Sequence, residues 1–266
     1  MKIQRPGPAA VILATLVCIF LVMPLVAVVP ISFTSSRFLV MPSGALSLTH
    51  YRALIENPDW ANSVLLSLRI GIVTSIVATG LALAFSLGVW MFQPRFSALF
   101  VGFVLLPMIV PPVVSAMTLY FLLTGLSQVS GLIGYDSWVG VTLAHVVMTA
   151  PFAVVLILVA LAQVDRRIDL AARGLGATVA QRAFSVILPN IRFGVATASL
   201  LVFVLSWEEI GVTLFITSVD TITLPRLMWM GVHDNIDPAI AAISVLLIVI
   251  TTLALLARMV WEARNR

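Results

Sequence analysis

The sequence predicts an all-α membrane protein with six transmembrane helices. It has 266 residues, of which 61% are hydrophobic and 10% are charged, and its mean hydropathy is +1.14. Soluble domains carry roughly 25% charged residues, so this composition indicates a chain that lies in lipid. A helix needs about 20 apolar residues to cross a bilayer. We expect one transmembrane domain over residues 1–266, with spans at about 9–33, 64–92, 98–124, 138–163, 194–218 and 238–261.

The distribution of lysine and arginine predicts that both termini are cytoplasmic, because these residues concentrate in cytoplasmic loops. In this orientation four of them, Arg37, Arg52, Arg69 and Arg226, lie on the outer side. The other eleven lie inside and are Lys2, Arg5, Arg95, Arg166, Arg167, Arg173, Arg182, Arg192, Arg258, Arg264 and Arg266. The first apolar run exceeds the ~7–15 residues of a signal-peptide core, so we expect it to remain as an uncleaved span.

The longest inner connection, residues 163–193, has regular apolar positions and should be structured. Its first part ends in Gly174 and Gly176, which is typical of a short helix terminated by glycine. Thr178 is suited to cap a second helix, which we expect Pro189 to break. The segment therefore predicts a helix–glycine–helix elbow on the cytoplasmic side.

The elbow contains a spaced motif. It consists of Leu170-Ala171-Ala172, three residues, Gly176, nine residues, and Val186-Ile187-Leu188-Pro189. This motif resembles the EAA loop of binding-protein-dependent ABC importer permeases, whose pattern is Glu-Ala-Ala-x3-Gly-x9-Ile-x-Leu-Pro. Leu170 stands where that family usually has glutamate, and the nearest acidic residue is Asp169.

Other stretches are similar to the spermidine/putrescine-type branch of the same family, and together they cover roughly residues 60–260. They are Asn62-Ser63, Pro107-Met108-Ile109-Val110-Pro111-Pro112, His145 with Pro151-Phe152, Ser206-Trp207-Glu208-Glu209, Thr223-Leu224-Pro225, and Asp237-Pro238 followed by Ala241 and Ser244.

The resemblance implies a type I ABC importer permease fold whose elbow is a coupling helix that docks on a separate ATPase subunit. The implied coupling residues are Ala171, Ala172, Gly176, Val186, Leu188 and Pro189. It further implies a second, homologous permease in a heterodimer, with a homodimer as the alternative, and an ATPase dimer. An extracytoplasmic solute-binding protein is implied to meet the outer loops around 34–61, 125–137 and 219–237. The location implied is the bacterial inner membrane.

Two adjacent carboxylates, Glu208 and Glu209, lie within the fifth apolar run. A charged side chain near the bilayer centre costs about 2.5–3.5 kcal/mol on insertion scales, so both should face protein or water. On a helix they would point about 100° apart and have unequal roles. One of them, with Trp207 as a cation–π face, is suited to a cationic substrate. Helix packing, gating or pairing with an arginine of a partner subunit are the alternatives.

Import of a polyamine such as putrescine or spermidine is therefore the predicted function. An amino acid, an opine, a phosphonate or a metal ion is the alternative substrate. A secondary transporter remains the competing class of transporter, although it would need inverted repeats and its own coupling-ion site. A structural or assembly membrane protein is a third class, which would need none of the elbow's spacing.

Several functions are disfavoured by what the sequence lacks. No HExxH or GxSxG motif occurs, Cys18 is the only cysteine, and Lys2 is the only lysine, whereas a P-loop needs a lysine on the nucleotide phosphates. We therefore expect no catalytic residues, no metal and no cofactor on this chain, with ATP and Mg²⁺ on the partner ATPase. The net charge of +4 does not indicate nucleic acid, because long apolar runs separate the basic residues.

Two further features are expected to shape the spans. His145 lies alone within the fourth apolar run, where a histidine more often hydrogen-bonds to a neighbouring helix than serves as a ligand or proton relay. The prolines at 107, 111, 112 and 151 are expected to interrupt helices, and such breaks in transporters can form hinges or expose carbonyls.

Overall fold

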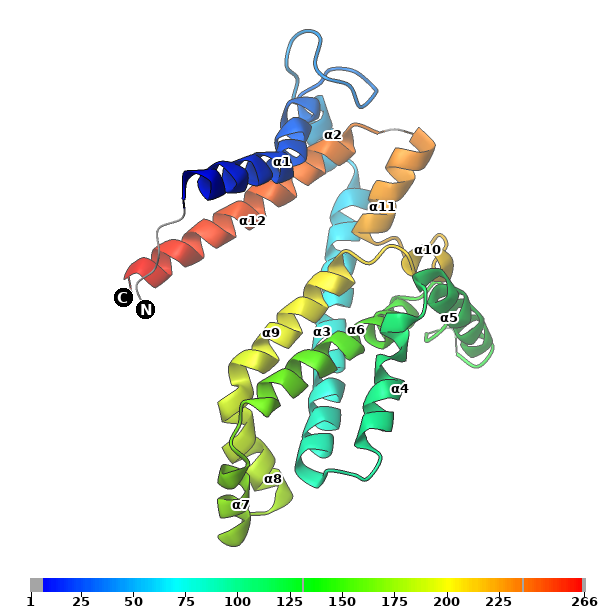
Figure 1. Cartoon of the computed structure of the whole chain (residues 1–266). Helices are drawn as coiled ribbons and strands as arrows, with labels where there is room; N and C mark the ends of the chain where they lie inside the picture. The colour runs from blue at the N-terminus through cyan, green and yellow to red at the C-terminus, as the bar shows by residue number, and fades with distance from the viewer. Residues whose placement is uncertain (1–6, 131, 236, 265–266) are drawn as a thin grey trace. The chain divides into compact units, whose positions relative to one another are not determined.

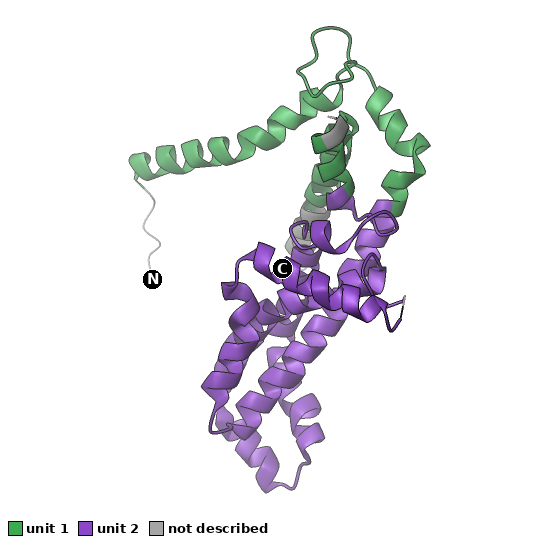
Figure 2. Cartoon of the chain, turned by 90° about the vertical axis from the view of Figure 1, so that its right-hand side faces the viewer, with its two compact units in different colours: residues 1–62, 227–266 green, residues 63–226 purple. Residues whose placement is uncertain are grey.

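The computed structural model describes residues 7–130, 132–235 and 237–264, and all regular secondary structure in these ranges is helical (Figure 1). The all-α prediction is therefore confirmed. The chain forms two compact units, residues 1–62 with 227–266 and residues 63–226, which are described separately (Figure 2). One transmembrane domain over the whole chain stays a prediction.

The first unit contains α1 (Pro8–Ser32), α2 (Thr49–Glu56) and α12 (Ala239–Arg264). Helix α12 packs against both α1 and α2, and the Ser32 hydroxyl lies 2.8 Å from the hydroxyl of Tyr51 on α2. Along α1, apolar side chains are exposed, which suits contact with lipid.

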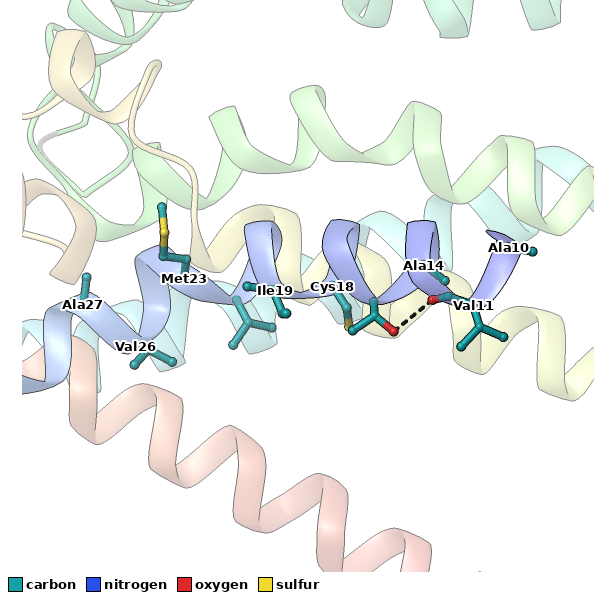
Figure 3. A pocket seen from close by; sticks show the side chains of 10 residues that line it. Ala10, Val11, Ala14, Cys18, Ile19, Met23, Val26 and Ala27 are labelled. Carbon is teal, nitrogen blue, oxygen red and sulfur yellow. Dashed lines mark hydrogen bonds between the residues drawn. The ribbon is translucent and has the colours of Figure 1, made fainter. Parts of the chain in front are cut away.

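A hollow of about 960 Å³ lies along α1. Figure 3 shows the side chains that line it. Every described residue that lines it belongs to this one helix. The lining is apolar apart from Thr15, whose hydroxyl donates a hydrogen bond to the carbonyl of Val11. The hollow therefore presents no carboxylate and no basic side chain to a solute.

Helix α3 (Pro58–Phe92) has 35 residues and begins before the predicted start at 64. At 1.5 Å per residue its length is about 52 Å, whereas the hydrocarbon core of a bilayer is about 30 Å thick. Part of α3 therefore extends beyond the apolar layer.

The core of the second unit is formed by α3, α6 (Trp138–Ala162) and α9 (Leu188–Trp207). Small residues allow close approach of α6 and α9, since a Cβ on Gly194 would lie 2.5 Å from the Cβ of Ala160. Between α3 and α9, the Ser75 hydroxyl donates to the carbonyl of Ser199 at 2.6 Å. Small residues and interhelical hydroxyl bonds are the usual means by which membrane helices associate.

The predicted third span is not one straight helix. It is divided into α4 (Ser97–Ile109) and α5 (Pro112–Ser127), which are bent by 100°. The cause is the proline pair, because Pro111 and Pro112 donate no backbone hydrogen bond and Val110 before them is extended, with ψ 133°. By contrast, Pro107 and Pro151 lie inside α4 and α6, so the expected interruption at these two residues is wrong.

The predicted fifth span also differs from the structure. Helix α9 ends at Trp207, residues 208–212 are unwound, and a short helix α10 (Thr213–Ile216) follows. The remaining elements are α7 (Arg166–Gly174), α8 (Val179–Gln181), a π-helix η1 (Arg182–Ile187), α11 (Leu224–Met230) and a π-helix η2 (Gly231–Asn235).

The described residues contain four helical runs long and apolar enough to cross a membrane, or five if α4 and α5 form one span. In α12 the described apolar stretch, Ala239–Leu253, is shorter. The count of six spans stays a prediction.

Candidate functional site

The segment that carries the spaced motif begins with α7, which lies beside α8 at one end of the second unit (Figure 1). Asp165 caps α7 by accepting a hydrogen bond from the backbone N–H of Arg167 at 2.9 Å. After the helix, Gly176 has φ +82°, a conformation that side-chain-bearing residues rarely adopt. This glycine therefore makes the turn from α7 to the next helix possible.

The second arm starts with a reciprocal cap. The Thr178 hydroxyl accepts from the N–H of Gln181, and the Gln181 side chain accepts from the N–H of Thr178. From there α8, η1 and α9 run without interruption from Val179 to Trp207. The expectation that Pro189 breaks this helix is wrong, because Pro189 lies in the first turn of α9 and the π-helical turn precedes it.

The motif residues differ in their burial. Ala171 and Pro189 are exposed, Gly176 lies at the exposed turn, and Ala172, Val186 and Leu188 are half-buried. Apolar side chains surround them on the surface: Leu170 is 61% exposed, Leu175 89% and Val179 48%. The segment thus presents an apolar surface formed by both of its arms.

A buried ion pair joins the two arms. Arg182 Nε and Nη2 donate to the two carboxylate oxygens of Asp169 at 2.7 and 2.5 Å. Both residues are 8% exposed. Such a two-point contact fixes orientation as well as distance, so it holds α7 against η1.

The acidic residues lie in the unwound segment 208–212, and not on a helix as the sequence predicted. Glu209 Oε1 accepts from the backbone N–H of Val212 at 2.9 Å, so this carboxylate is held in the loop. Glu208 is exposed, and among the described residues its carboxylate has no hydrogen-bond partner. The two glutamates are therefore in different environments.

A cavity of about 250 Å³ lies between the α4–α5 break and this segment. Glu208 and Glu209 are its ionisable lining residues, and Phe152 of α6 contributes an aromatic ring. The remaining lining residues are Pro107, Met108, Val110, Pro112, Met148, Thr149 and Leu205. The predicted pathway residue Trp207 is not among them, and its ring stacks on Phe203 with centroids 6.1 Å apart.

His145 of α6 is 1% exposed and is not among the residues that line the cavity. Its Nδ1 is 2.8 Å from the Ser206 hydroxyl at the end of α9, and its Nε2 is 3.0 Å from the Thr213 hydroxyl at the start of α10. The predicted hydrogen bond to a neighbouring helix is thus present, and a second bond accompanies it.

Asp136 joins two connections of the second unit. Its carboxylate accepts from the backbone N–H groups of Val219, Asp220 and Thr221 at 2.8 to 3.0 Å. Burial raises the pKa of Asp136, but the hydrogen bonds from these backbone groups outweigh it, so the pKa lies below its ordinary value. No local signal in the sequence indicates this role of Asp136, because its partners are more than 80 residues away.

The described residues contain no group of three or more histidine, cysteine or acidic side chains placed to hold a metal ion. That the chain has no catalytic residue, metal or cofactor stays a prediction. Sequence analysis also missed Arg182 as the partner of Asp169, and the thirteen-residue spacing across a turn is the only signal that could have indicated it.

Long apolar helices, a bent helix pair at two prolines and a cavity lined by two carboxylates are features typical of a membrane transport protein. The family described as "Binding-protein-dependent transport system inner membrane component" matches residues 76–266. The chain belongs to this family and is an ABC importer permease.

Curated relatives agree with this assignment. The putrescine transport system permease protein PotI of Escherichia coli is 28% identical over 91% of this chain and 86% of its own length. The spermidine/putrescine transport system permease protein PotC of Escherichia coli is 25% identical over 91% of this chain and 89% of its own length. These relatives confirm the predicted resemblance to the spermidine/putrescine-type branch.

Two other similar proteins have names that do not refer to polyamines. A probable molybdenum ABC transporter permease protein of Haloferax volcanii is 30% identical over 79% of this chain and 80% of its own length. A crystal structure of a bacterial ABC transporter involved in the import of the acidic polysaccharide alginate matches with a TM-score of 0.73 at 14% identity, over 97% of this chain and 94% of the other. This structural match confirms the fold of an ABC importer permease.

Proposed function

We propose that this permease forms the membrane pathway for a small organic cation, a polyamine such as putrescine or spermidine, delivered by an extracytoplasmic binding protein. The observation that carries the proposal is the Glu208 carboxylate, which lines the cavity and is not bonded to any described residue. Glu209 and the ring of Phe152 line the same cavity. Carboxylates and an aromatic face are the groups that attract an alkylammonium ion. The putrescine-related names of the relatives support the same class of substrate.

The proposal includes a coupling role for the segment at 163–193. Its apolar surface docks in a groove of an ATPase subunit, with Ala171 allowing close approach and Gly176 the turn. Leu170 makes this contact apolar where the family usually has glutamate. The complex contains two ATPase copies, which bind ATP and Mg²⁺, and a second homologous permease. It lies in the bacterial inner membrane with both termini of this chain in the cytoplasm, and the chain itself carries no cofactor.

A metal-ion system is the second candidate, and the molybdenum-named relative favours it. Amino acids, opines and phosphonates complete the set of alternatives. The substrate is tested by reconstituting the permease pair with its ATPase and binding protein in liposomes. We expect putrescine and spermidine to stimulate ATP hydrolysis more than arginine, a phosphonate or molybdate. The polyamine assignment is wrong if both polyamines fail and another of these solutes stimulates.

The coupling role is tested with two glycines of the same segment. A Cβ on Gly174 or on Gly176 meets no atom within 4 Å, but only Gly176 has a positive φ. Gly176→Val should therefore strain the turn by about 1–2 kcal/mol and lower the amount of ATPase that co-purifies. Gly174→Ala is the matched control and should bind the ATPase normally. Unchanged binding and transport in the Gly176→Val permease would refute the coupling role.

A further inference from the structure

The two hydrogen bonds of His145 go to the two ends of the same unwound segment. Ser206 is the last residue but one of α9, and Thr213 is the first residue of α10. Between them lie Glu208 and Glu209, which line the cavity. The carbonyl of His145 itself accepts from the hydroxyl of Thr149, another lining residue, at 2.7 Å. The imidazole thus connects α6 to both ends of the segment that carries the carboxylates.

The hydrogen-bond network also defines which ring nitrogen carries the proton. The Thr213 hydroxyl donates its one hydrogen to the carbonyl of Glu209 at 3.1 Å, so it accepts from His145 Nε2. In the neutral ring Nδ1 then accepts from the Ser206 hydroxyl. Every polar atom of the ring is satisfied in this one arrangement, which fixes the distance between Ser206 and Thr213.

We propose that His145 is a positioning residue of the solute pathway, which holds both ends of segment 208–212 and thereby sets where the Glu208 carboxylate lies in the cavity. The inference rests on the proposed role of this cavity as the pathway. A histidine that served only to pack α6 against α9 would need a single bond to α9. Here the second bond reaches α10, beyond the acidic residues.

The test separates hydrogen bonding from ring packing. His145→Phe keeps an aromatic ring but removes both bonds, and the two hydroxyls can turn to backbone carbonyls. His145→Gln keeps one donor and one acceptor. Each is combined with Cys18→Ser, which removes the only native cysteine, and with Glu208→Cys as a reporter. The rate of reaction with a small cationic methanethiosulfonate is then measured in membranes containing the full chain, with exposed Leu132→Cys as the reference position.

We expect His145→Phe to change the labelling rate at position 208 by about fivefold, which corresponds to one hydrogen bond of average strength. In His145→Gln the labelling rate at position 208 should stay within about twofold of that in the parent. The labelling rate of Leu132→Cys should not change in either variant. Equal labelling rates at position 208 in the parent, the Phe variant and the Gln variant would overturn the proposal. So would an equal change with Phe and Gln, since the ring rather than its bonds would then matter.

Two further measurements keep the test decisive. If the Phe variant fails to insert, the pair Ser206→Ala and Thr213→Val removes both histidine bonds, together with the bond from Thr213 to the Glu209 carbonyl, with the histidine in place. An unchanged labelling rate there overturns the proposal. With Glu208 intact, His145→Phe should raise the half-saturating putrescine concentration more than it lowers the maximal uptake rate. Failure of putrescine uptake in the parent refutes the polyamine assignment alone, because the labelling rate requires no substrate.

Discussion

Glu208 and Glu209 are neighbours in the sequence, but their carboxylates lie in different environments. Glu209 accepts a backbone hydrogen bond from Val212 and so stabilises the unwound segment. Glu208 makes no such bond to the described residues and faces the same cavity. The two glutamates therefore allow a matched comparison. The Glu208 carboxylate is not bonded to a described residue, whereas the Glu209 carboxylate stabilises the unwound segment.

Replacing each glutamate by its neutral isostere should give unequal results. Glu208→Gln removes a charged acceptor from the cavity, and the half-saturating putrescine concentration should rise about tenfold. Glu209→Gln keeps an oxygen that can accept from Val212, so the same concentration should stay within about threefold. Uptake of labelled putrescine into proteoliposomes measures both. Equal effects of the two substitutions would contradict this division of roles.

Asp136 is a residue whose charge should matter for stability, and the pH dependence can be given a sign. Its pKa is lowered in the folded state from an ordinary value of 3.8. The carboxylate therefore stabilises the fold fully above that ordinary value, and the contribution is lost as the pH falls through the lowered pKa. At neutral pH the hydrogen bonds to Val219, Asp220 and Thr221 are all retained.

Asp136→Asn should cost about 1–2 kcal/mol at pH 7, because the amide group turns a donor toward backbone donors. The difference in thermal midpoint from the parent, measured in detergent, should persist at pH 5 and narrow below about pH 4. Asp220→Asn is the control, since only its backbone N–H contributes to this contact. A midpoint difference that is constant down to pH 2 would show that the charge of Asp136 is not responsible.

At the scale of elements, the bond between Asp169 and Arg182 should make α7 and η1 move as one body. Arg182→Met leaves the Asp169 carboxylate without its partner, which is destabilising, so stability and ATPase co-purification should both fall. Adding Asp169→Leu removes the unpaired carboxylate, so stability and ATPase co-purification should both recover. Arg173→Met, at an exposed position of α7, should change neither. A double variant as unstable as Arg182→Met alone would show that the unpaired carboxylate is not the cause of the instability.

How far the elements could be predicted depends on the range of the interactions that shape them. Hydropathy located α1, α6 and most of α3, because burial in lipid acts on each helix separately. Proline chemistry predicted a break at Pro111, but it did not predict the size of the bend, which is 100°. The average hydropathy of the predicted fifth span stays high despite Glu208 and Glu209, so it did not indicate that residues 208–212 are unwound.

In the elbow and the cavity, too, local features could be predicted from the sequence and long-range contacts could not. Gly176 and the Thr178 cap were readable because turn and capping signals are local. His145 lies 61 and 68 residues from its two partners, so its role needed the tertiary structure. Local chemistry therefore located the segments, and long-range contacts determined how the side chains within them are used.

At the scale of the whole molecule, the bent pair α4–α5 decides which parts of the chain lie on the same side of the membrane. If the pair crosses the membrane and α12 does as well, the number of spans is even, and both termini and the 163–193 segment lie on the same side. If the pair instead enters and leaves on one side, the number is odd. The 163–193 segment then lies opposite the N-terminus, and with the N-terminus in the cytoplasm it could not reach a cytoplasmic ATPase. The arginine and lysine distribution favours the even count.

Single cysteines in the Cys18→Ser chain distinguish these two topologies. Gly44→Cys lies in the connection between α1 and α2, and Gly174→Cys lies at the end of α7, both with open space at the Cβ. In intact cells a membrane-impermeant maleimide should label position 44 and leave position 174 unlabelled until the membrane is opened. Fluorescence of a C-terminal green fluorescent protein fusion should confirm a cytoplasmic C-terminus. Labelling of position 174 in intact cells would make α4–α5 a re-entrant pair and would remove the physical basis for coupling to an ATPase.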